Sequence, residues 1–279
     1  MSIHPTAVIS PSARIGAGVC VGPFACIDDD VVVGDGCVIG PHACLLRFTT
    51  IGRNCRVHAH AVLGDLPQDR SFRGDDSFVV VGDDCVIREG VTIHRGTLPG
   101  STTRIGNGCL LMAQCHVAHN VSIGDQVIIV NNALLGGHVE VGSRAVISGN
   151  CMVHQHARIG RLAMLSGGSG AQMDVPPFCM TRSICTNKIM SLNVVGLRRA
   201  GFSVEDRREL HQAFRILYRS GLSVPRAVER LEREFTCPYV REMADFLKAS
   251  KRGICSFIQS GRYADAGRDA DETPRLMAA

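Results

Sequence analysis

Two histidines, His116 and His119, lie three positions apart in the segment CHVAHN at residues 115–120. Imidazoles at this spacing fit three roles: packed core side chains, a pair of metal ligands, or a general base with a polar helper. Histidine has an unperturbed pKa of about 6.5, so a neutral ring can accept a proton near pH 7. The pattern of the residues around the pair favours one of these roles.

Aliphatic residues recur at every sixth position on both sides of this segment. One run extends from Ile9 to Leu63, a short one covers 81–93, and a third extends from Ile105 to Leu165. Neither a helical period of about 3.6 nor simple alternation gives a strict six, whereas a coil of short strands with tight corners does. We therefore predict a parallel β-helix. Its aliphatic residues should point inward beside small residues two places earlier, and the glycines that often follow should adopt backbone angles closed to other residues.

Breaks in the repeat predict how the chain is organised. We expect a β-helix domain over 1–188, with insertions near 64–80 and 95–104. Helical signals follow and predict a small helical domain over 189–261. The last segment, 262–279, is polar and without periodicity, and we expect it to be disordered.

Three helices are predicted in the second domain. Ser203 is a typical N-cap with Asp206 three residues later, and the first helix should run from there to about Gly221. The second should begin with Ser223 as cap and Pro225 in its first turn. The third covers 238–250.

Composition narrows the class of protein. The chain has 279 residues, 13 cysteines and a net charge of +4, which is too small to indicate a nucleic-acid partner. No stretch approaches the roughly 18 apolar residues of a membrane span, and the start lacks a secretory signal, so we expect a cytoplasmic protein with reduced thiols. Six cysteines fall in the small inward position of the repeat, where packing explains them: Cys37, Cys55, Cys85, Cys109, Cys115 and Cys151.

The repeat also predicts which polar residues meet. If one turn takes eighteen residues, His119 lies beneath Gly137, with His138 beside that glycine, and residues 154–155 lie one coil further on. Three segments then place polar groups on one edge of the coil. A histidine near an unobstructed glycine N–H is the pairing of general base and oxyanion donor that acyl transfer needs. His116, in the same segment, would orient the base or the substrate.

Other columns carry a simpler interpretation. His156 stacks over His138 by the same count, and solvated corner residues are the expected role for this ring and for those of His42, His58 and His60. Gln114, Asn132 and Asn150 form a predicted amide ladder, which we interpret as structural. Gamma-type carbonic anhydrases, which are β-helix enzymes, bind zinc with a histidine pair spaced by four residues and lack a comparable insertion near 64–78. The closer pair here argues against a metal site.

Several motifs together resemble a known family. In order, they are GPFACI, GDLPQD, VTIHRGT, CHVAHN, LGGHV, VHQ, GGSGAQMDVPP and GLRRAGFS. This order is similar to that of UDP-N-acetylglucosamine 3-O-acyltransferases, the first enzymes of lipid A synthesis, and the similarity extends from residue 4 to about 258. The resemblance implies a left-handed coil with three hexapeptides per turn, an exception to the usual right-handed crossover. It also implies a homotrimer with active sites between subunits, in the cytoplasm of a Gram-negative-type bacterium.

The resemblance implies an acyltransferase without a cofactor, and it assigns roles to individual residues. The donor is a (3-hydroxy)acyl chain on acyl carrier protein, and the acceptor is UDP-N-acetylglucosamine. His119 matches the general base, Gly137 the oxyanion donor and Gly167 the position that limits acyl length. Because Gly167 has no side chain, we expect an open groove and a chain of roughly C12 or longer. The remaining matches are implied to bind substrate or to support the base: His116, Asp69, His94, His138, His154, Gln155, Asn193 and Arg199.

The chain departs from the family pattern at four positions. Asn120 follows the base where aspartate is common, and Ser71 replaces a typical lysine, with Arg70 or Arg73 nearby as compensating cations. Val195 and Ala200 replace polar or charged residues beside Asn193 and Arg199.

Two alternatives stay open at this point, a different acceptor and a non-catalytic scaffold, whereas a third, the later N-acyltransferase, is disfavoured. A related enzyme would acylate a sugar with a 3-amino group in place of the hydroxyl. The later N-acyltransferase of the same pathway carries a nucleotide-binding domain before its repeats, and here the repeat begins by residue 9. A non-catalytic trimeric β-helix scaffold would bind a carrier protein through a cluster of arginines: Arg198, Arg199, Arg207 and Arg208.

Overall fold

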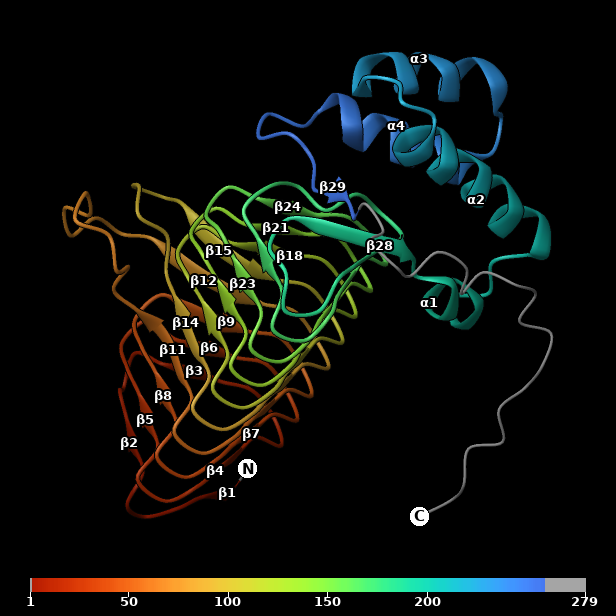
Figure 1. Ribbon diagram of the computed structural model, residues 1–279. Coiled ribbons are helices and arrows are strands. Elements are labelled where there is room, and N and C mark those ends of the chain that lie inside the picture. Colours follow the sequence, from red (N-terminus) through yellow and green to blue (C-terminus); the bar gives the residue numbers. More distant parts are fainter. Residues whose placement is uncertain (1, 259–279) are drawn as a thin grey trace.

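The six-residue period produces a three-sided coil of very short strands. In the computed structural model, which describes residues 2–258, most strands are only two residues long and each is followed by a two-residue corner. Figure 1 shows the coils stacked into a prism with the helices gathered at its C-terminal end. Successive coils pair as parallel strands, so each face of the prism is one sheet.

Sheets A, B and C form the three faces in the order in which the chain visits them. Sheet A contains β1 (Ser2–Ile3), β4 (Cys20–Val21), β7 (Val38–Ile39), β10 (Arg56–Val57), β13 (Val86–Ile87), β16 (Leu110–Leu111), β19 (Ile128–Ile129), β22 (Val146–Ile147), β25 (Met164–Leu165), β27 (Cys179–Thr181), β28 (Lys188–Leu192) and β29 (Ser256–Phe257). Sheet B contains β2 (Val8–Ile9), β5 (Cys26–Ile27), β8 (Cys44–Leu45), β11 (Val62–Asp65), β14 (Thr92–His94), β17 (His116–Val117), β20 (Leu134–Leu135), β23 (Met152–Val153) and β26 (Gly170–Ala171). Sheet C contains β3 (Arg14–Ile15), β6 (Val32–Val33), β9 (Thr49–Ile51), β12 (Phe78–Val81), β15 (Thr102–Ile105), β18 (Ser122–Ile123), β21 (Glu140–Val141) and β24 (Arg158–Ile159).

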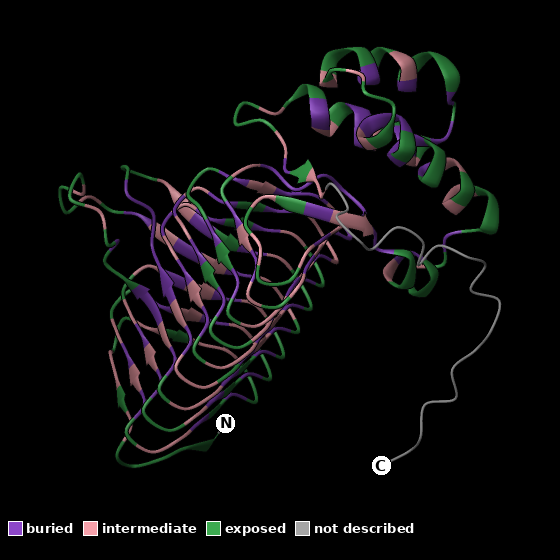
Figure 2. Ribbon diagram, viewed as in Figure 1, coloured by how far each residue is buried: buried purple, intermediate pink, exposed green. Residues whose placement is uncertain are grey.

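The predicted register between coils is confirmed. His116 pairs with Leu134 and Leu134 with Met152, eighteen residues apart at each step. The aliphatic position is the second residue of each strand and is fully buried in the middle coils, as at Leu135, and the small residue two places earlier, such as Ala133, is buried beside it. Figure 2 shows this alternation as narrow buried bands running up the prism. The interior is thus a single apolar column.

The expected reason for the repeated glycines was wrong. Within the regular repeat, glycines that follow the aliphatic residue, such as Gly34 and Gly106, do not have positive φ angles; Gly64, where the first insertion begins, does (φ 92°). They are needed because the next coil lies directly above: a methyl group on Gly34 would lie 2.6 Å from backbone atoms of Gly52. The left-handed backbone angles occur instead at the second corner residue, which is often Asn, Asp or His, as at Asn54 (φ 56°).

Both insertions leave the prism at the same edge. The first joins β11 to β12 and the second joins β14 to β15, so each departs where sheet B turns into sheet C. We call this line of corners the B–C edge. The strand pairing resumes in register after each insertion, with Val79 opposite Thr49 and Arg104 opposite Val80.

The inward cysteines are packed as predicted, and their thiols also make polar contacts. Cys37 and Cys55 are fully buried, and the thiol of each donates to a corner carbonyl of the next coil, at 3.0 Å and 3.1 Å. A thiol therefore satisfies a backbone oxygen that alanine would leave without this partner. Every one of the 13 cysteines lies within the described residues, and none of them forms a disulfide there.

Four helices follow the coil. The three predicted helices are confirmed as α2 (Val204–Arg219), α3 (Val224–Glu234) and α4 (Pro238–Lys248). Ser203 and Asp206 form the expected capping box, whereas Ser223 caps α3 without a side-chain hydrogen bond. The short helix α1 (Val194–Arg199) was not predicted. The segment 262–279, for which disorder was expected, lies outside the described residues.

The helices are fixed to the coil by one polar contact in particular. Arg161 makes a bidentate ion pair with Glu242 of α4, and its guanidinium also lies over the rings of Phe178 and Tyr239. Within residues 2–258, no helix has both the length and the apolar character to cross a bilayer.

Candidate active site

His119 lies at the corner that follows β17, on the B–C edge, and faces Gly137 of the next coil. Its side chain is largely buried. A methyl group added to Gly137 would lie 2.5 Å from both Cε1 and Nε2 of the His119 ring. His119 and the bare corner at Gly137, which the eighteen-residue count predicted to face each other, are thus in close contact.

Of the two polar backbone groups of Gly137, only the carbonyl has a hydrogen-bond partner among the described residues. Its carbonyl accepts the N–H of His156 at 2.9 Å, and the N–H of His138 donates to the carbonyl of His119 at 3.0 Å. The N–H of Gly137 itself has no acceptor among the described residues. A backbone donor beside an imidazole is the arrangement that can stabilise an oxyanion.

Asn120 determines which nitrogen of His119 is basic. The backbone N–H of Thr97 donates to the Asn120 side chain at 2.9 Å, and since an N–H can only donate, the accepting atom is the amide oxygen. The same oxygen lies 3.0 Å from His119 Nδ1, so Nδ1 must carry a proton. Nε2 is then the nitrogen with the free lone pair. Thr103 accepts the Asn120 N–H at 2.8 Å and fixes the corner.

Asp69 reaches the base from the first insertion. Its Oδ2 lies 3.6 Å from His119 Nε2. Hydrogen bonds from Ser71, first from its N–H at 2.9 Å and then from its side chain, lower the pKa of Asp69, and the nearby His119 lowers it further. Ser71, one of the departures from the family pattern, therefore keeps this carboxylate ionised beside the base.

His116, which is half-buried, and the buried His94 form a pair on sheet B. The His116 Nδ1 hydrogen-bonds the hydroxyl of Thr92 at 2.7 Å, and the two rings meet edge to face at 5.1 Å. Burial lowers the pKa of His116 to about 4, with smaller effects from the charges of His94 and His119. Burial is also the main cause of the lowered pKa of His94, whose Nδ1 has no hydrogen-bond partner among the described residues.

His138 and His156 continue the line of rings above the base. The His138 ring meets that of His119 edge to face at 5.2 Å and stacks on that of His156 at 4.6 Å. The stacking of His156 on His138 is thus confirmed. Burial, followed by the charges of His156 and His119, lowers the pKa of His138, and Asp69 opposes this shift.

His154 and Gln155 lie one coil above Gly137. Both side chains are exposed, and the backbone N–H of Gln155 would be 2.7 Å from a methyl group on Gly136. Arg252, which follows α4, comes within 3.2 Å of His154 Nδ1 and donates to the carbonyl of Gln172 at 3.0 Å. A cation from the far end of the chain therefore joins this part of the edge.

Three other predicted residues lie elsewhere in the chain. Gly167 is exposed at a corner between sheets A and B. Asn193 is buried: its amide oxygen accepts the N–H of Gly196 as the N-cap of α1, and its amide nitrogen donates to the carbonyl of Leu162 at 2.9 Å. Arg199 is exposed near the end of α1.

The two residues beside them that depart from the family pattern differ in exposure. Val195 is exposed, and Ala200 caps α1 while packing against the core. Sequence analysis did not find Thr92, Thr97 or Arg252 as part of the edge. Thr92 could have been found by counting past the second insertion, whereas no signal in the sequence connects Arg252 with His154.

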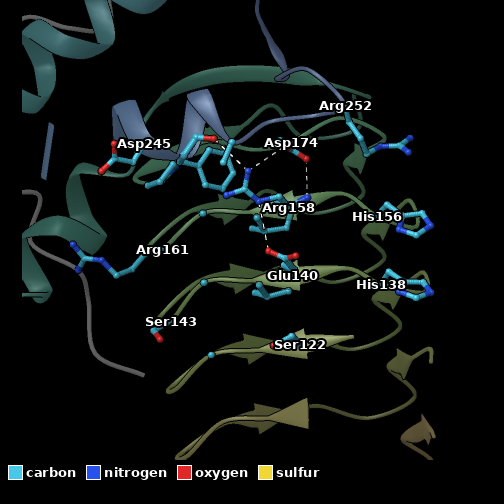
Figure 3. Close-up of a pocket in the computed structure, with 18 of the residues that line it drawn as sticks. Ser122, His138, Glu140, Ser143, His156, Arg158, Arg161, Asp174, Asp245 and Arg252 are labelled. Carbon is cyan, nitrogen blue, oxygen red and sulfur yellow. Dashed lines mark hydrogen bonds and ion pairs between the residues drawn. The ribbon is translucent and has the colours of Figure 1, made fainter. Parts of the chain in front are cut away.

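A large cavity adjoins the B–C edge. It has a volume of about 1160 Å³ and lies between the outer face of sheet C and α4, with Asn120, His138 and His156 on its lining. Figure 3 shows Arg158 at its centre, paired with Glu140 (3.5 Å) and Asp174 (3.7 Å) and stacked on the ring of Phe246. Within residues 2–258, no three His, Cys, Asp or Glu side chains are grouped so as to hold a metal ion.

A parallel β-helix with an imidazole and a bare peptide N–H on one edge defines a hexapeptide-repeat acyltransferase. Models of the six-residue bacterial transferase repeat match residues 30–65 and 102–137, and the model described as UDP N-acetylglucosamine O-acyltransferase, domain 2, matches 174–255. An acyl-[acyl-carrier-protein]–UDP-N-acetylglucosamine O-acyltransferase of Syntrophobacter fumaroxidans is 42% identical over 256 residues, covering 91% of this chain and 99% of that protein. The protein of the same name from Halorhodospira halophila is 44% identical over 254 residues, covering 90% and 98%. The chain belongs to the acyl-[acyl-carrier-protein]–UDP-N-acetylglucosamine O-acyltransferase family.

Solved structures agree with this assignment. A UDP-N-acetylglucosamine acyltransferase from Bacteroides fragilis superposes with a TM-score of 0.87 at 38% identity, covering 90% of this chain and 98% of that one. One from Campylobacter jejuni gives 0.86 at 37% identity, covering 92% and 100%. The fold class is the expected left-handed parallel β-helix with a small helical C-terminal part, and the chain is an acyltransferase.

Proposed function

We propose that this protein transfers an acyl chain from acyl carrier protein to the 3-hydroxyl of UDP-N-acetylglucosamine, with His119 as the general base. The close approach of the His119 ring to Gly137, whose N–H has no acceptor among the described residues, carries the proposal, because it supplies a proton acceptor and an oxyanion donor within one site. Under this assignment the reaction is the first step of lipid A synthesis in a Gram-negative-type bacterium.

The transfer proceeds by direct attack. The sugar 3-hydroxyl gives its proton to His119 Nε2 while its oxygen bonds to the thioester carbonyl carbon. The carbonyl oxygen becomes an oxyanion that accepts from the Gly137 N–H. When the carbon–sulfur bond breaks, the imidazolium returns the proton to the thiol of the carrier. Asn120 keeps the proton on Nδ1 throughout, so that Nε2 does the exchange.

The positions of the remaining residues around His119 Nε2 suggest their roles. Asp69 lies 3.6 Å from Nε2 and is placed to accept from a sugar hydroxyl that approaches the base. His116, kept neutral by burial and hydrogen-bonded to Thr92, serves as a hydrogen-bonding group beside the reacting carbon. We assign substrate contacts on the same edge to His94, His138, His154 and Gln155.

An apolar strip connects the base with Gly167. On the outer face of sheet B, His116 is followed coil by coil by Leu134, Met152 and Gly170, and the first two apolar side chains are 43% and 60% exposed. Such exposure on adjacent strands suits an acyl chain. A methyl group at Gly167 would approach nothing closer than 3.8 Å, so the strip is open at this end, and we expect a long acyl chain.

The outer faces of the prism support a homotrimer with sites between neighbouring subunits. Sheet C carries polar and charged side chains on its outer face, such as Arg104 and Glu140. Sheet A instead presents an aligned apolar row made up of Val86, Leu110, Ile128, Val146 and Met164. Closing three copies about one axis would cover the apolar faces and leave sheet C in water. Asn193 and Arg199 would then be supplied to a neighbour's site.

Arginines of the helical part provide a surface for the carrier protein. None of the four, Arg198, Arg199, Arg207 and Arg208, forms an ion pair with any of residues 2–258. Their charges are available to an external anion.

One assay tests the whole proposal. Purified protein is incubated with 3-hydroxyacyl carrier proteins of several chain lengths and UDP-N-acetylglucosamine, and products are identified by mass spectrometry. We expect an ester at the sugar 3-position, with almost no turnover in His119→Ala, which should keep the mass of the assembly. Substantial turnover by that variant, or acylation only of a 3-amino sugar nucleotide, would refute the assignment of base or acceptor respectively.

A further inference from the structure

His138 and His156 form a ring stack on the B–C edge, directly beside the proposed base. Both are second corner residues with left-handed backbone angles, at φ 59° and 62°, and they lie on successive coils. Their planes differ by only 15°, whereas the rings of His138 and His119 are nearly perpendicular at 86°. Figure 3 shows the two stacked rings projecting side by side at the rim of the cavity.

The stack gives its two members different surroundings. The side chain of His156 is exposed to water, whereas that of His138 is partly buried. The charged groups around them are Asp69 and His119 from below and, from the coil and the segment after α4, Glu140, Arg158, Asp174, Lys251 and Arg252. Glu140 and Asp174 both lie near the guanidinium of Arg158, and among the described residues neither Lys251 nor Arg252 has a carboxylate partner, so these two cations remain on the upper side.

We propose that His156 is a positioning residue for the transfer, because its ring stacks on that of His138 and fixes the plane in which His138 meets His119. His138 then stays neutral and presents its edge to His119 while the base holds the substrate proton. A second cation on His138, with its ring 5.2 Å from that of the base, would oppose this protonation. The pKa of His138 is lowered by burial and then by His156, so the stack also favours the neutral form of His138. The inference rests on the proposed role of His119.

The same stacking occurs elsewhere in the chain and provides a matched control. Phe24, His42 and His60 stack at 5.0 Å along corners between sheets A and B, and His60, like His156, is exposed. Its backbone N–H likewise bonds to the coil below. His60→Ala therefore removes an equivalent ring away from His119.

The first experiment measures kinetics of three variants of the full chain across pH. We expect His156→Ala to lose about tenfold in kcat with KM values for both substrates within about twofold, since the ring of His138 is no longer held. His156→Phe keeps the stack without the proton and should recover most of kcat at high pH, with an acid limb shifted to higher pH. His60→Ala should match the parent enzyme. A loss in His156→Ala that lies in KM, or none at all, would overturn the proposal.

The second experiment follows His138 by histidine ring NMR in the free protein. Its titration midpoint should rise in His156→Phe because the neighbouring charge is gone, and an unchanged midpoint would refute the electrostatic part of the proposal. This readout needs no turnover, so it remains valid whether or not His119 is the base. It also remains available if His156→Ala does not fold.

Discussion

Gly137 faces the ring of His119 so closely that there is no room for a methyl group between them. Gly137→Ala would keep its N–H but push the imidazole from its place, since the added carbon would be 2.5 Å from Nε2. We expect kcat to fall by about a hundredfold or more, whereas the thermal midpoint should change little. Steady-state kinetics and a melting curve check this. Activity near that of the parent enzyme would mean that the ring has space to move and that the close contact is not required.

Asn120 should be needed for its oxygen. Asn120→Leu removes the acceptor that holds the proton on Nδ1, and we expect kcat to fall by about tenfold to a hundredfold as the wrong tautomer becomes populated. Asn120→Asp restores an acceptor and adds a negative charge, which stabilises the imidazolium. Its acid limb in kcat/KM should therefore move to higher pH. Identical profiles for the parent and the aspartate variant would show that the charge does not reach the base.

Gly167 should control the length of the acyl chain. Because nothing lies within 3.8 Å of a methyl group there, Gly167→Met should fold normally and place its side chain in the groove. We expect kcat/KM to shift toward shorter donors, measured with carrier proteins that bear a series of acyl chains. An unaltered chain-length profile would place the end of the groove elsewhere.

His116 should make the fold less stable in acid. Its pKa is lowered to about 4 in the folded chain, whereas the unfolded value is about 6.5. Between these values the unfolded chain binds more protons, so the free energy of unfolding decreases as the pH falls, on the order of 2 kcal/mol per chain by about pH 5. His116→Asn can keep the bond to Thr92 and does not titrate. The urea midpoint of the parent should therefore be lower at about pH 5 than at about pH 7.5, and this difference should be smaller in the variant. If parent and variant lose the same stability between the two pH values, His116 is not the source of the loss.

The six-residue repeat predicted the coil, and the eighteen-residue turn predicted which residues stack on one another, because packing of the interior sets both periods. One aliphatic side chain per hexapeptide must point inward, so a constant count places His119 beneath Gly137 and His138 beneath His156. The same count fails across the insertions, which is why Thr92 was not recognised as the partner of His116.

Other contacts had no local signal. Asp69 reaches His119 through the conformation of a loop, and Arg252 approaches His154 from 98 residues away. For Asn193 the sequence pattern suggested substrate binding, but the structure shows a structural role. Its side chain caps α1 and bonds to the carbonyl of Leu162. A role in a neighbouring site stays a prediction. The reason for the glycines was missed because close approach between coils is a property of the stack and not of one corner.

Both insertions leave the prism along one line of corners, and the strands on either side keep their pairing. Segments at this line can change in length or sequence without disturbing the count that stacks the rest of the chain. The repeat that stacks the coils must therefore stay constant, whereas the two insertions are free to vary. Altered acceptor preference could then arise by exchange of these two loops alone, while the buried column keeps the molecule folded.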